Sequence, residues 1–249
     1  MKTAMLCVQG NWAHFKKPET NNNPLTHDFL TKTALLGMIG AVLGKERDAM
    51  KGLFPRLSED LRYGVALLRP VKKQTWSFTL RRFAADRSKL EVTTLSPRPF
   101  EFLRKPCFKV VVGLADNRSE AEFNDFLELV AESKTHYDPV LGLHNCPAEI
   151  SLLKTGKAET MVGRFSTEGF VPRSSSPDPI EALGRGAFRL GFDRLPTYQD
   201  NAMFNPPDRY VEVVYPDRIL ADIPSLLSGD GAHFRVDWDA SEEECWCLI

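Results

Sequence analysis

Residues 29–44 read FLTKTALLGMIGAVLG and are apolar nearly all round. Thr31 or Thr33 can cap the start of a helix over this stretch, and Gly44 can end it. A helix that is apolar on every side lies inside a fold, because none of its faces suits water. The stretch therefore predicts a buried first helix, around which the other elements can be placed.

A short strand and a long loop precede this helix. The apolar run Met5–Gln9 is followed by Gly10 and predicts the first strand. The next stretch, Asn11–Asp28, is polar and contains Pro18, Pro24 and three consecutive Asn residues, which favours an irregular loop. Long ordered loops in compact domains are often functional, so this loop is a candidate part of a site.

Three strands, one helix and a hairpin follow. Alternating polar and apolar positions over Val71–Arg82 and Leu90–Leu95 predict a protruding hairpin. Without the hairpin, the order through residue 153 is strand, helix, strand, strand, helix, strand. This is the ferredoxin-like order, which RNA-recognition modules use, and it predicts an α+β fold. The remaining elements are strands at Tyr63–Leu68, Phe108–Leu114 and Ala148–Leu153, and a helix opened by a capping-box pattern at Ser119 and Glu122.

The chain changes character after Lys154. Strand-like runs at Arg209–Tyr215 and Ile219–Ile223 lie among Pro-rich loops. We therefore predict a ferredoxin-like domain over residues 1–153, with the inserted hairpin at about 72–100, and a smaller β-rich region over residues 154–249.

Charge is distributed unevenly along the 249 residues. The 32 Lys and Arg residues nearly balance the 33 Asp and Glu residues, so the formal net charge is −1. Residues 69–109 nevertheless hold eleven Lys and Arg against three acids, a net +8, whereas residues 217–249 carry −6. The near-neutral total therefore does not exclude a polyanionic partner.

The basic segment coincides with the predicted hairpin, where aromatic residues lie between the cations. Cations suit phosphates and planar rings stack on unpaired bases, so the combination is typical of single-stranded RNA binding. A solvated hairpin whose aromatic residues form its own small core would give the same pattern. The candidate RNA contacts here are Lys72, Lys73, Trp76, Arg81, Arg82, Arg87, Lys89, Arg98, Arg104 and Lys105.

Signatures of common enzyme classes are absent. The chain has no GxxxxGK[ST], HExxH or GxSxG motif, and its five Cys residues include no CxxC pair. We expect no metal, no cofactor and reduced thiols. A catalytic alternative uses His14 or His27 with Lys32, which could deprotonate a ribose 2′-hydroxyl and stabilise the developing phosphorane without a metal. Stacking or hydrogen bonding by the two His residues is the simpler interpretation.

Composition also bears on the compartment. Hydrophobic residues make up 43% of the chain, an ordinary share for a globular protein with a sizeable core. No run approaches the roughly 18 apolar residues of a membrane span, and the N-terminal stretch lacks a signal-peptide cleavage site. We expect a cytoplasmic protein that makes no membrane contact.

Several stretches resemble one protein family. Residues 6–10 (LCVQG), 14–20 (HFKKPET) and 30–44 (LTKTALLGMIGAVLG) resemble the N-terminus of the Cas5 subunit of type I CRISPR surveillance complexes, known as Cascade. In that family a strand, a loop with Phe and Pro, and a helix of the form T-A-x-x-G-x-x-x-A-x-x-G follow one another. Residues 102–106 (FLRKP) and 137–143 (YDPVLGL) look similar as well, so the resemblance spans residues 5–153.

The resemblance implies a RAMP-type ferredoxin-like domain with a β-hairpin thumb, which maps to about residues 72–100. It implies a non-catalytic RNA-binding subunit that caps the 5′ handle of the CRISPR RNA (crRNA), beside the large subunit and the first backbone subunit. Contact with target DNA near the PAM-proximal end stays open. Handle-facing positions map to the loop and to the positive end of the first helix: His14, Phe15, Lys16, Lys17, Lys32 and Thr33.

Two further points concern activity and subtype. Some type I-C members cleave the repeat RNA with a Tyr, Lys and His set, but Lys134–Tyr137 does not lie in a matching context here. The sequence looks most similar to subtype I-B, including its transposon-encoded relatives. Three hypotheses stay open: an architectural RNA-binding subunit, which we favour, a metal-independent RAMP endoribonuclease that processes repeat RNA, and a protein-binding scaffold.

Overall fold

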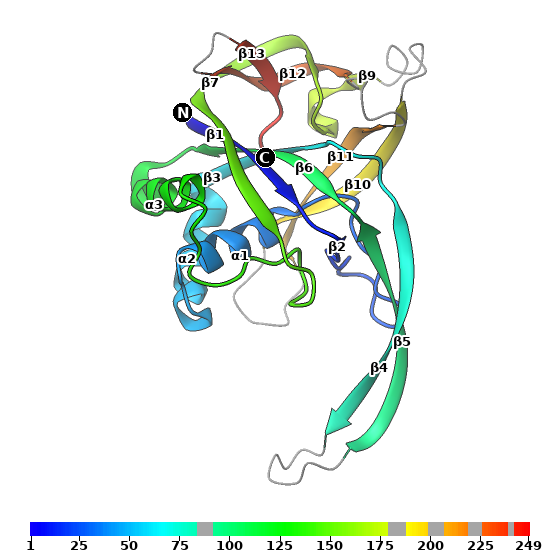
Figure 1. Ribbon diagram of the computed structural model, residues 1–249. Helices are drawn as coiled ribbons and strands as arrows, with labels where there is room; N and C mark the ends of the chain where they lie inside the picture. Colours follow the sequence, from blue (N-terminus) through cyan, green and yellow to red (C-terminus); the bar gives the residue numbers. More distant parts are fainter. Residues whose placement is uncertain (84–91, 179–187, 199–206, 219–225, 239–241) are drawn as a thin grey trace.

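The computed structural model describes residues 1–83, 92–178, 188–198, 207–218, 226–238 and 242–249. They form a mixed α/β fold around a curled antiparallel sheet (Figure 1). The helices are α1 (Lys32–Val42), α2 (Arg47–Asp60) and α3 (Glu120–Ala131), with short 3₁₀ turns at Asn117–Ser119 and Arg173–Ser175. The strands are β1 (Lys2–Gln9), β2 (Trp12–Ala13), β3 (Leu61–Leu67), β4 (Lys73–Phe83), β5 (Val92–Arg104), β6 (Cys107–Leu114), β7 (Glu149–Thr167), β8 (Val171–Pro172), β9 (Pro177–Asp178), β10 (Phe188–Tyr198), β11 (Arg209–Arg218), β12 (Leu227–Trp238) and β13 (Glu242–Trp246).

The main sheet has the strand order β13-β12-β7-β1-β6-β3, and β9 pairs with β12. Helices α1 and α2 connect β1 to β3, and α3 connects β6 to β7. Two three-stranded sheets complete the fold, β10-β11-β8 and β2-β5-β4. The predicted combination of helices and strands in one fold is confirmed, and the sheet is antiparallel. No helix in the described part of the chain is long and apolar enough to cross a membrane.

Both faces of the central strands are buried. Leu6 and Val110, which lie opposite each other on β1 and β6, belong to the core that the helices cover. Met5 and Val111 point to the other face and pack in a second cluster with Trp238. The sheet can bury both faces because it curls, bringing β12 and β13 over the side that carries no helix (Figure 1). This explains why the strands read as continuous apolar runs.

The first helix is confirmed but shorter than predicted. It begins at Lys32 and not at Phe29. Phe29 and Leu30 are buried in the preceding segment, whose backbone is not helical. The Thr31 hydroxyl accepts a hydrogen bond from the Ala34 N–H at 3.3 Å, which makes Thr31 the cap. Gly44 follows the helix end with φ +67°, a backbone conformation that glycine adopts without strain.

Helix α2 was not predicted, and the capping box at Ser119 is wrong. Gly52 and Pro55 lie inside α2, and their low helix propensity argues against a helix in the sequence, although Leu53 and Leu57 are buried at helical spacing. The Ser119 hydroxyl makes no cap bond to α3. It donates instead to the carboxylate of Asp60, at 2.6 Å, where α2 ends. The predicted helix does begin after Ser119, but the Ser119 side chain connects that start to the end of α2 and does not cap it.

The region after Lys154 is continuous with the rest of the fold. Strand β7 extends from Glu149 through Thr167, so the predicted boundary at residue 153 falls inside it, and β12 joins the same sheet. The division into two regions stays a prediction. The strand predicted at Arg209–Tyr215 corresponds to β11, whereas the one at Ile219–Ile223 lies outside the described residues.

Candidate nucleic-acid interface

Strands β4 and β5 form a long two-stranded ribbon that projects away from the body of the molecule (Figure 1). The sequence predicted the hairpin but ended its second strand at Leu95, before Pro97 and Pro99. Strand β5 continues to Arg104. Glu101, two residues beyond Pro99, directs its N–H away from β4 to the Pro24 carbonyl at 3.0 Å. The same alternation places the missing N–H positions of both prolines on the outer edge, where no bond to β4 is lost.

The pairing register places the large apolar side chains on one face of the ribbon. Trp76 lies opposite Phe100, and Phe78 opposite Arg98. Alternation along the strand adds Leu80 to the same face. Trp76, Phe78 and Leu80 expose 45%, 37% and 47% of their surface, so they do not form a closed core within the hairpin. We call Trp76, Phe78, Leu80 and Phe100 the aromatic face.

The aromatic face meets a second group of rings at the base of the ribbon. Trp12 of β2 contacts Trp76 edge to face, with the ring centroids 5.2 Å apart. Phe78 contacts the buried ring of Phe102 at 5.8 Å. A recess of about 170 Å³ lies among these rings and is bordered by Asn145 and Cys146. Rings fixed in this way offer planar surfaces whose orientation is set before a ligand arrives.

Cations flank the aromatic face. Arg98 lies on it and donates to the Asn22 side-chain oxygen at 2.7 Å. Arg104 and Lys105 are exposed at the base of the ribbon. Lys105 has φ +49°, and its N–H donates to the Asn11 carbonyl at 2.8 Å, so a turn fixes its position. Lys105 and Arg69 line a recess of about 300 Å³ beside β1.

Two cations of the basic segment form ion pairs with acidic residues of the same chain. Lys73 forms ion pairs with Asp28 at 2.7 Å and Glu101 at 3.1 Å, and these hydrogen bonds raise its pKa although burial opposes them. Lys109 pairs with Glu168 at 3.0 Å. Lys72 and Lys73 are both exposed, but the Lys73 ammonium is engaged by its two carboxylate partners. The charge that faces solvent is therefore smaller than the sequence count of +8.

Some predicted contacts lie outside the described side chains. Arg81 and Arg82 belong to β4, where they pair with Leu95 and Thr94 at the backbone level. Arg87 and Lys89 lie within residues 84–91, which the structure does not describe.

The predicted contact residues of the N-terminal loop differ in how far they are exposed. His14 and Phe15 are only 3% exposed. The His14 Nδ1 lies 2.7 Å from the Glu101 carbonyl, and burial lowers its pKa. Lys16 is exposed and donates to Asn21 at 3.3 Å. Burial of His14 and Phe15 leaves Lys16 as the accessible member of this group.

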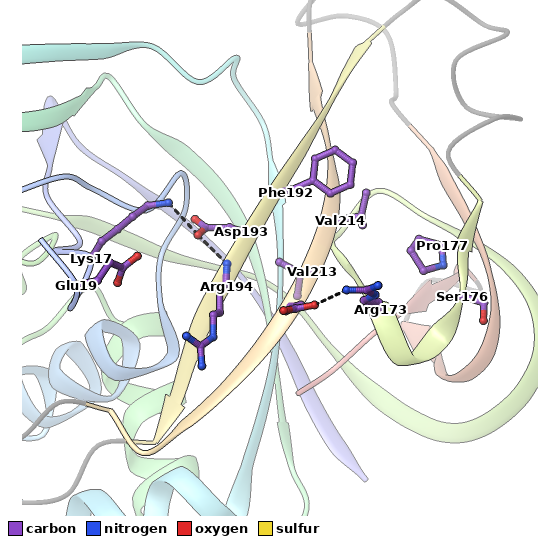
Figure 2. A pocket seen from close by; sticks show the side chains of 11 residues that line it. Lys17, Glu19, Arg173, Ser176, Pro177, Phe192, Asp193, Arg194, Val213 and Val214 are labelled. Carbon is purple, nitrogen blue, oxygen red and sulfur yellow. Dashed lines mark hydrogen bonds and ion pairs between the residues drawn. The ribbon is translucent and has the colours of Figure 1, made fainter.

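Lys17 and His27 meet at a buried carboxylate, Asp193 of β10. Figure 2 shows Lys17 and Asp193. Lys17 Nζ lies 3.0 Å from it, and His27 Nδ1 lies 3.0 Å from its second oxygen. Burial alone would raise the pKa of Asp193, but the His27 hydrogen bond and the Lys17 charge hold it well below its usual range. The loop is thereby tied to the β10-β11-β8 sheet.

Lys32 and Thr33 lie at the start of α1 and contact other groups. Lys32 is 3% exposed and donates to the Ile249 carbonyl at 3.3 Å. Thr33 is half-buried, and its hydroxyl lies 3.1 Å from that of Thr31. The three residues of the catalytic alternative, His14, His27 and Lys32, thus contact three different groups: the Glu101 carbonyl, Asp193 and the Ile249 carbonyl.

Sequence reasoning missed Trp12 and Arg69. Trp12 belongs to a two-residue strand, which is too short to give a periodic signal. Arg69 was counted only as charge, because nothing in its neighbours shows that it borders a recess with Lys105.

Comparisons with known proteins identify related folds. A family model described as CRISPR-associated protein (Cas5) matches residues 5–205. A crystal structure of a CRISPR protein from Archaeoglobus fulgidus aligns with a TM-score of 0.56 and 12% identity, covering 99% of both chains. A chain of a CRISPR RNA-guided surveillance complex aligns with a TM-score of 0.55 and 14% identity, covering 87% of this chain and 90% of the other. A search of curated proteins gave no match.

Proposed function

The chain belongs to the CRISPR-associated Cas5 family, and on this premise we propose that it is a non-catalytic RNA-binding subunit of a type I surveillance complex. It binds the 5′ handle of the crRNA through the β4–β5 ribbon. The observation that carries the proposal is the exposed aromatic face, flanked by Arg98 at mid-ribbon and by Arg104 and Lys105 at its base.

Exposed rings have a direct use in binding single-stranded RNA. Burying apolar surface is favourable, and the neighbouring exposed side chains of Trp76, Phe78 and Leu80 form a contiguous apolar patch of the kind that marks a binding surface. Unstacked bases supply flat apolar surfaces, and each base stacked on a ring contributes about 1–3 kcal/mol. The neighbouring cations then contact the phosphates on either side of a stacked base.

The family supplies the finer part of the proposal. The order of β7-β1-β6-β3 with its helices supports a ferredoxin-like RAMP domain, and the projecting ribbon serves as its thumb. The subunit contacts the large subunit and the first backbone subunit in the cytoplasm. Subtype I-B and contact with target DNA near the PAM-proximal end belong to the same proposal.

The RNA contact is tested by measuring binding of a repeat-derived handle RNA to the full chain by fluorescence anisotropy. We expect Trp76→Ala combined with Phe78→Ala to weaken binding by tenfold or more, because stacked bases lose their platform. Phe192→Ala is the matched control, since Phe192 is a 69% exposed aromatic residue on β10. Equal binding by the double variant and the control would refute the role of the aromatic face.

The cations are tested through salt dependence. Arg98→Gln with Arg104→Gln removes two phosphate contacts, so the slope of log K against log salt concentration should fall by about 1.4. Arg47→Gln, an exposed residue of α2, should leave the slope unchanged. An unchanged slope in the double variant would favour the protein-binding scaffold.

The absence of catalysis is part of the proposal. Burial of His14, His27 and Lys32 against separate partners supports it, since a general base must reach the 2′-hydroxyl of the RNA. Incubating the chain with repeat RNA in EDTA tests this directly, and we expect intact RNA. Site-specific cleavage that His27→Ala abolishes would establish the endoribonuclease instead.

A further inference from the structure

A second pocket lies away from the aromatic face, where α1, α2, β3, β11 and β12 meet near the C-terminal residues. Its volume is about 560 Å³, within the range of small-ligand sites. The side chains that line it include Lys32, Arg62, Arg209, Glu59, Tyr198 and His233. Three cationic side chains and one acidic side chain therefore border this pocket.

The cations come from three elements that are distant in sequence. Lys32 begins α1, Arg62 lies on β3 and Arg209 begins β11. The guanidinium of Arg209 lies over the Tyr198 ring, 5.2 Å from its centroid. The Glu59 carboxylate is directed in part to another partner, Arg118, at 3.8 Å. The fold thus gathers positive charge here without an acidic side chain devoted to it among the described residues.

Lys32 is the unusual member of the group. Its side chain is 3% exposed, and no Asp or Glu in the described part of the chain pairs with it. Its hydrogen bond goes to the main-chain oxygen of Ile249, at 3.3 Å. Burial, and then the nearby charges of Arg62 and Arg209, lower the pKa of Lys32 to about 7. A buried cation beside two like charges is unfavourable unless an anion joins them.

We propose that this pocket binds a phosphate group through Lys32, Arg62 and Arg209. The guanidinium groups supply paired donors that match phosphate oxygens, and the ammonium supplies a charge inside the pocket. The phosphate belongs either to the guide RNA or to a free phosphorylated compound. The site is separate from the ribbon, so the second source requires nothing of the RNA-binding proposal.

The first measurement uses inorganic phosphate and the full chain without RNA. We expect phosphate at several times its dissociation constant to raise the melting temperature by roughly 2–4 °C over chloride at equal ionic strength. Arg62→Gln and Arg209→Gln should each reduce this rise, and Lys32→Met should remove it. Arg47→Gln, exposed on α2 and outside the pocket, is the control and should keep the full rise.

The second measurement separates the two sources. If the pocket holds a phosphate of the guide RNA, inorganic phosphate competes with the handle RNA, and Arg62→Gln lowers the salt slope of RNA binding. If it holds a free phosphorylated compound, RNA binding is the same in wild type and Arg62→Gln. Either result supports the site.

The site is overturned if phosphate gives no more stabilisation than chloride, or if wild type, Lys32→Met and Arg62→Gln are stabilised equally. Because this first measurement contains no RNA, its failure is independent of any failure of RNA binding by the ribbon.

Discussion

At the scale of single residues, the Asp193 carboxylate connects distant parts of the chain. It receives Lys17 and His27 from the N-terminal loop and also accepts the Arg194 N–H at 2.8 Å. Its side chain is 3% exposed, so the two partners are its substitute for water. The loop that leads into α1 therefore depends on a residue more than 160 positions away.

Asp193→Asn should lower the free energy of unfolding by about 1.5–3 kcal/mol at pH 7, because the hydrogen bonds that Lys17 and His27 make to the carboxylate lose their charged acceptor. The lowered pKa means that the carboxylate stabilises the fold above about pH 4 and loses this effect as the pH falls further. The difference between wild type and variant should therefore shrink in acid. Urea unfolding at pH 7 and pH 3 measures both effects.

Asp48→Asn is the matched control, since Asp48 is an 88% exposed carboxylate paired with Lys51. It should change stability by less than about 0.5 kcal/mol. Similar losses in the two variants would contradict the role given to Asp193.

Lys32 should make stability depend on pH in the range above neutrality. Its folded pKa of about 7 lies below the value of about 10.4 expected in the unfolded chain, so unfolding takes up a proton between these limits. Stability should therefore rise with pH from 7 to 10. Lys32→Met should be more stable than wild type at pH 6.5 and should lose this rise. Urea unfolding in chloride at pH 6.5 and 9 tests it, and identical pH profiles would show that Lys32 keeps its ordinary pKa.

At the scale of elements, two glycines of α1 have different surroundings. Gly40 packs inside the fold, whereas Gly37 faces solvent. A Cβ on Gly40 would lie 2.6 Å from Met50 Sδ, so this glycine lets α2 approach α1. A Cβ on Gly37 would meet nothing within 4 Å. A second backbone could therefore approach α1 closely at Gly37 but not at Gly40.

Gly37→Ala should stabilise the chain by about 0.5–1 kcal/mol, because alanine costs less backbone entropy in a helix. Gly40→Ala should gain less or destabilise, since Met50 must move. Chemical unfolding of the two variants gives the comparison. A Gly40→Ala variant as stable as Gly37→Ala would show that the contact between α1 and α2 is loose.

The same scale shows what sequence patterns could predict. The first strand, α1, β6 and the base of the hairpin follow from apolar runs and caps. Helix α2 was not predicted because Gly52 and Pro55 have low helix propensity. In the folded chain, the packing of Leu53 and Leu57 outweighs this local preference. Strand β5 was cut short because strand alternation alone does not show which edge a proline faces.

At the scale of the whole molecule, the segregated charge takes a spatial form. The acidic C-terminal strands β12 and β13 lie at the far end of the body from the outer ends of β4 and β5 (Figure 1). Part of their charge is neutralised locally, since Glu242 pairs with Lys154 and Glu244 lies 3.9 Å from Lys109. The ribbon therefore carries its positive charge away from the acidic strands, which favours contact with a polyanion.

The residues of the candidate site differ in how far the sequence alone could predict their role. The exposed ribbon could be predicted because its residues are contiguous in sequence. The burial of His14, Phe15 and Lys32, and the meeting of Lys32 with Arg62 and Arg209, could not, because they depend on tertiary contacts between segments 30 to 180 residues apart.

The most direct test of the account is photo-crosslinking of the handle RNA to the chain, followed by mass spectrometry of the crosslinked peptides. We predict crosslinks in β4 and β5, centred on Trp76, Phe78 and Phe100, with Trp12 as a further position. Crosslinks confined to α2, α3 or β10, with none on the ribbon, would contradict the claim that the aromatic face binds RNA.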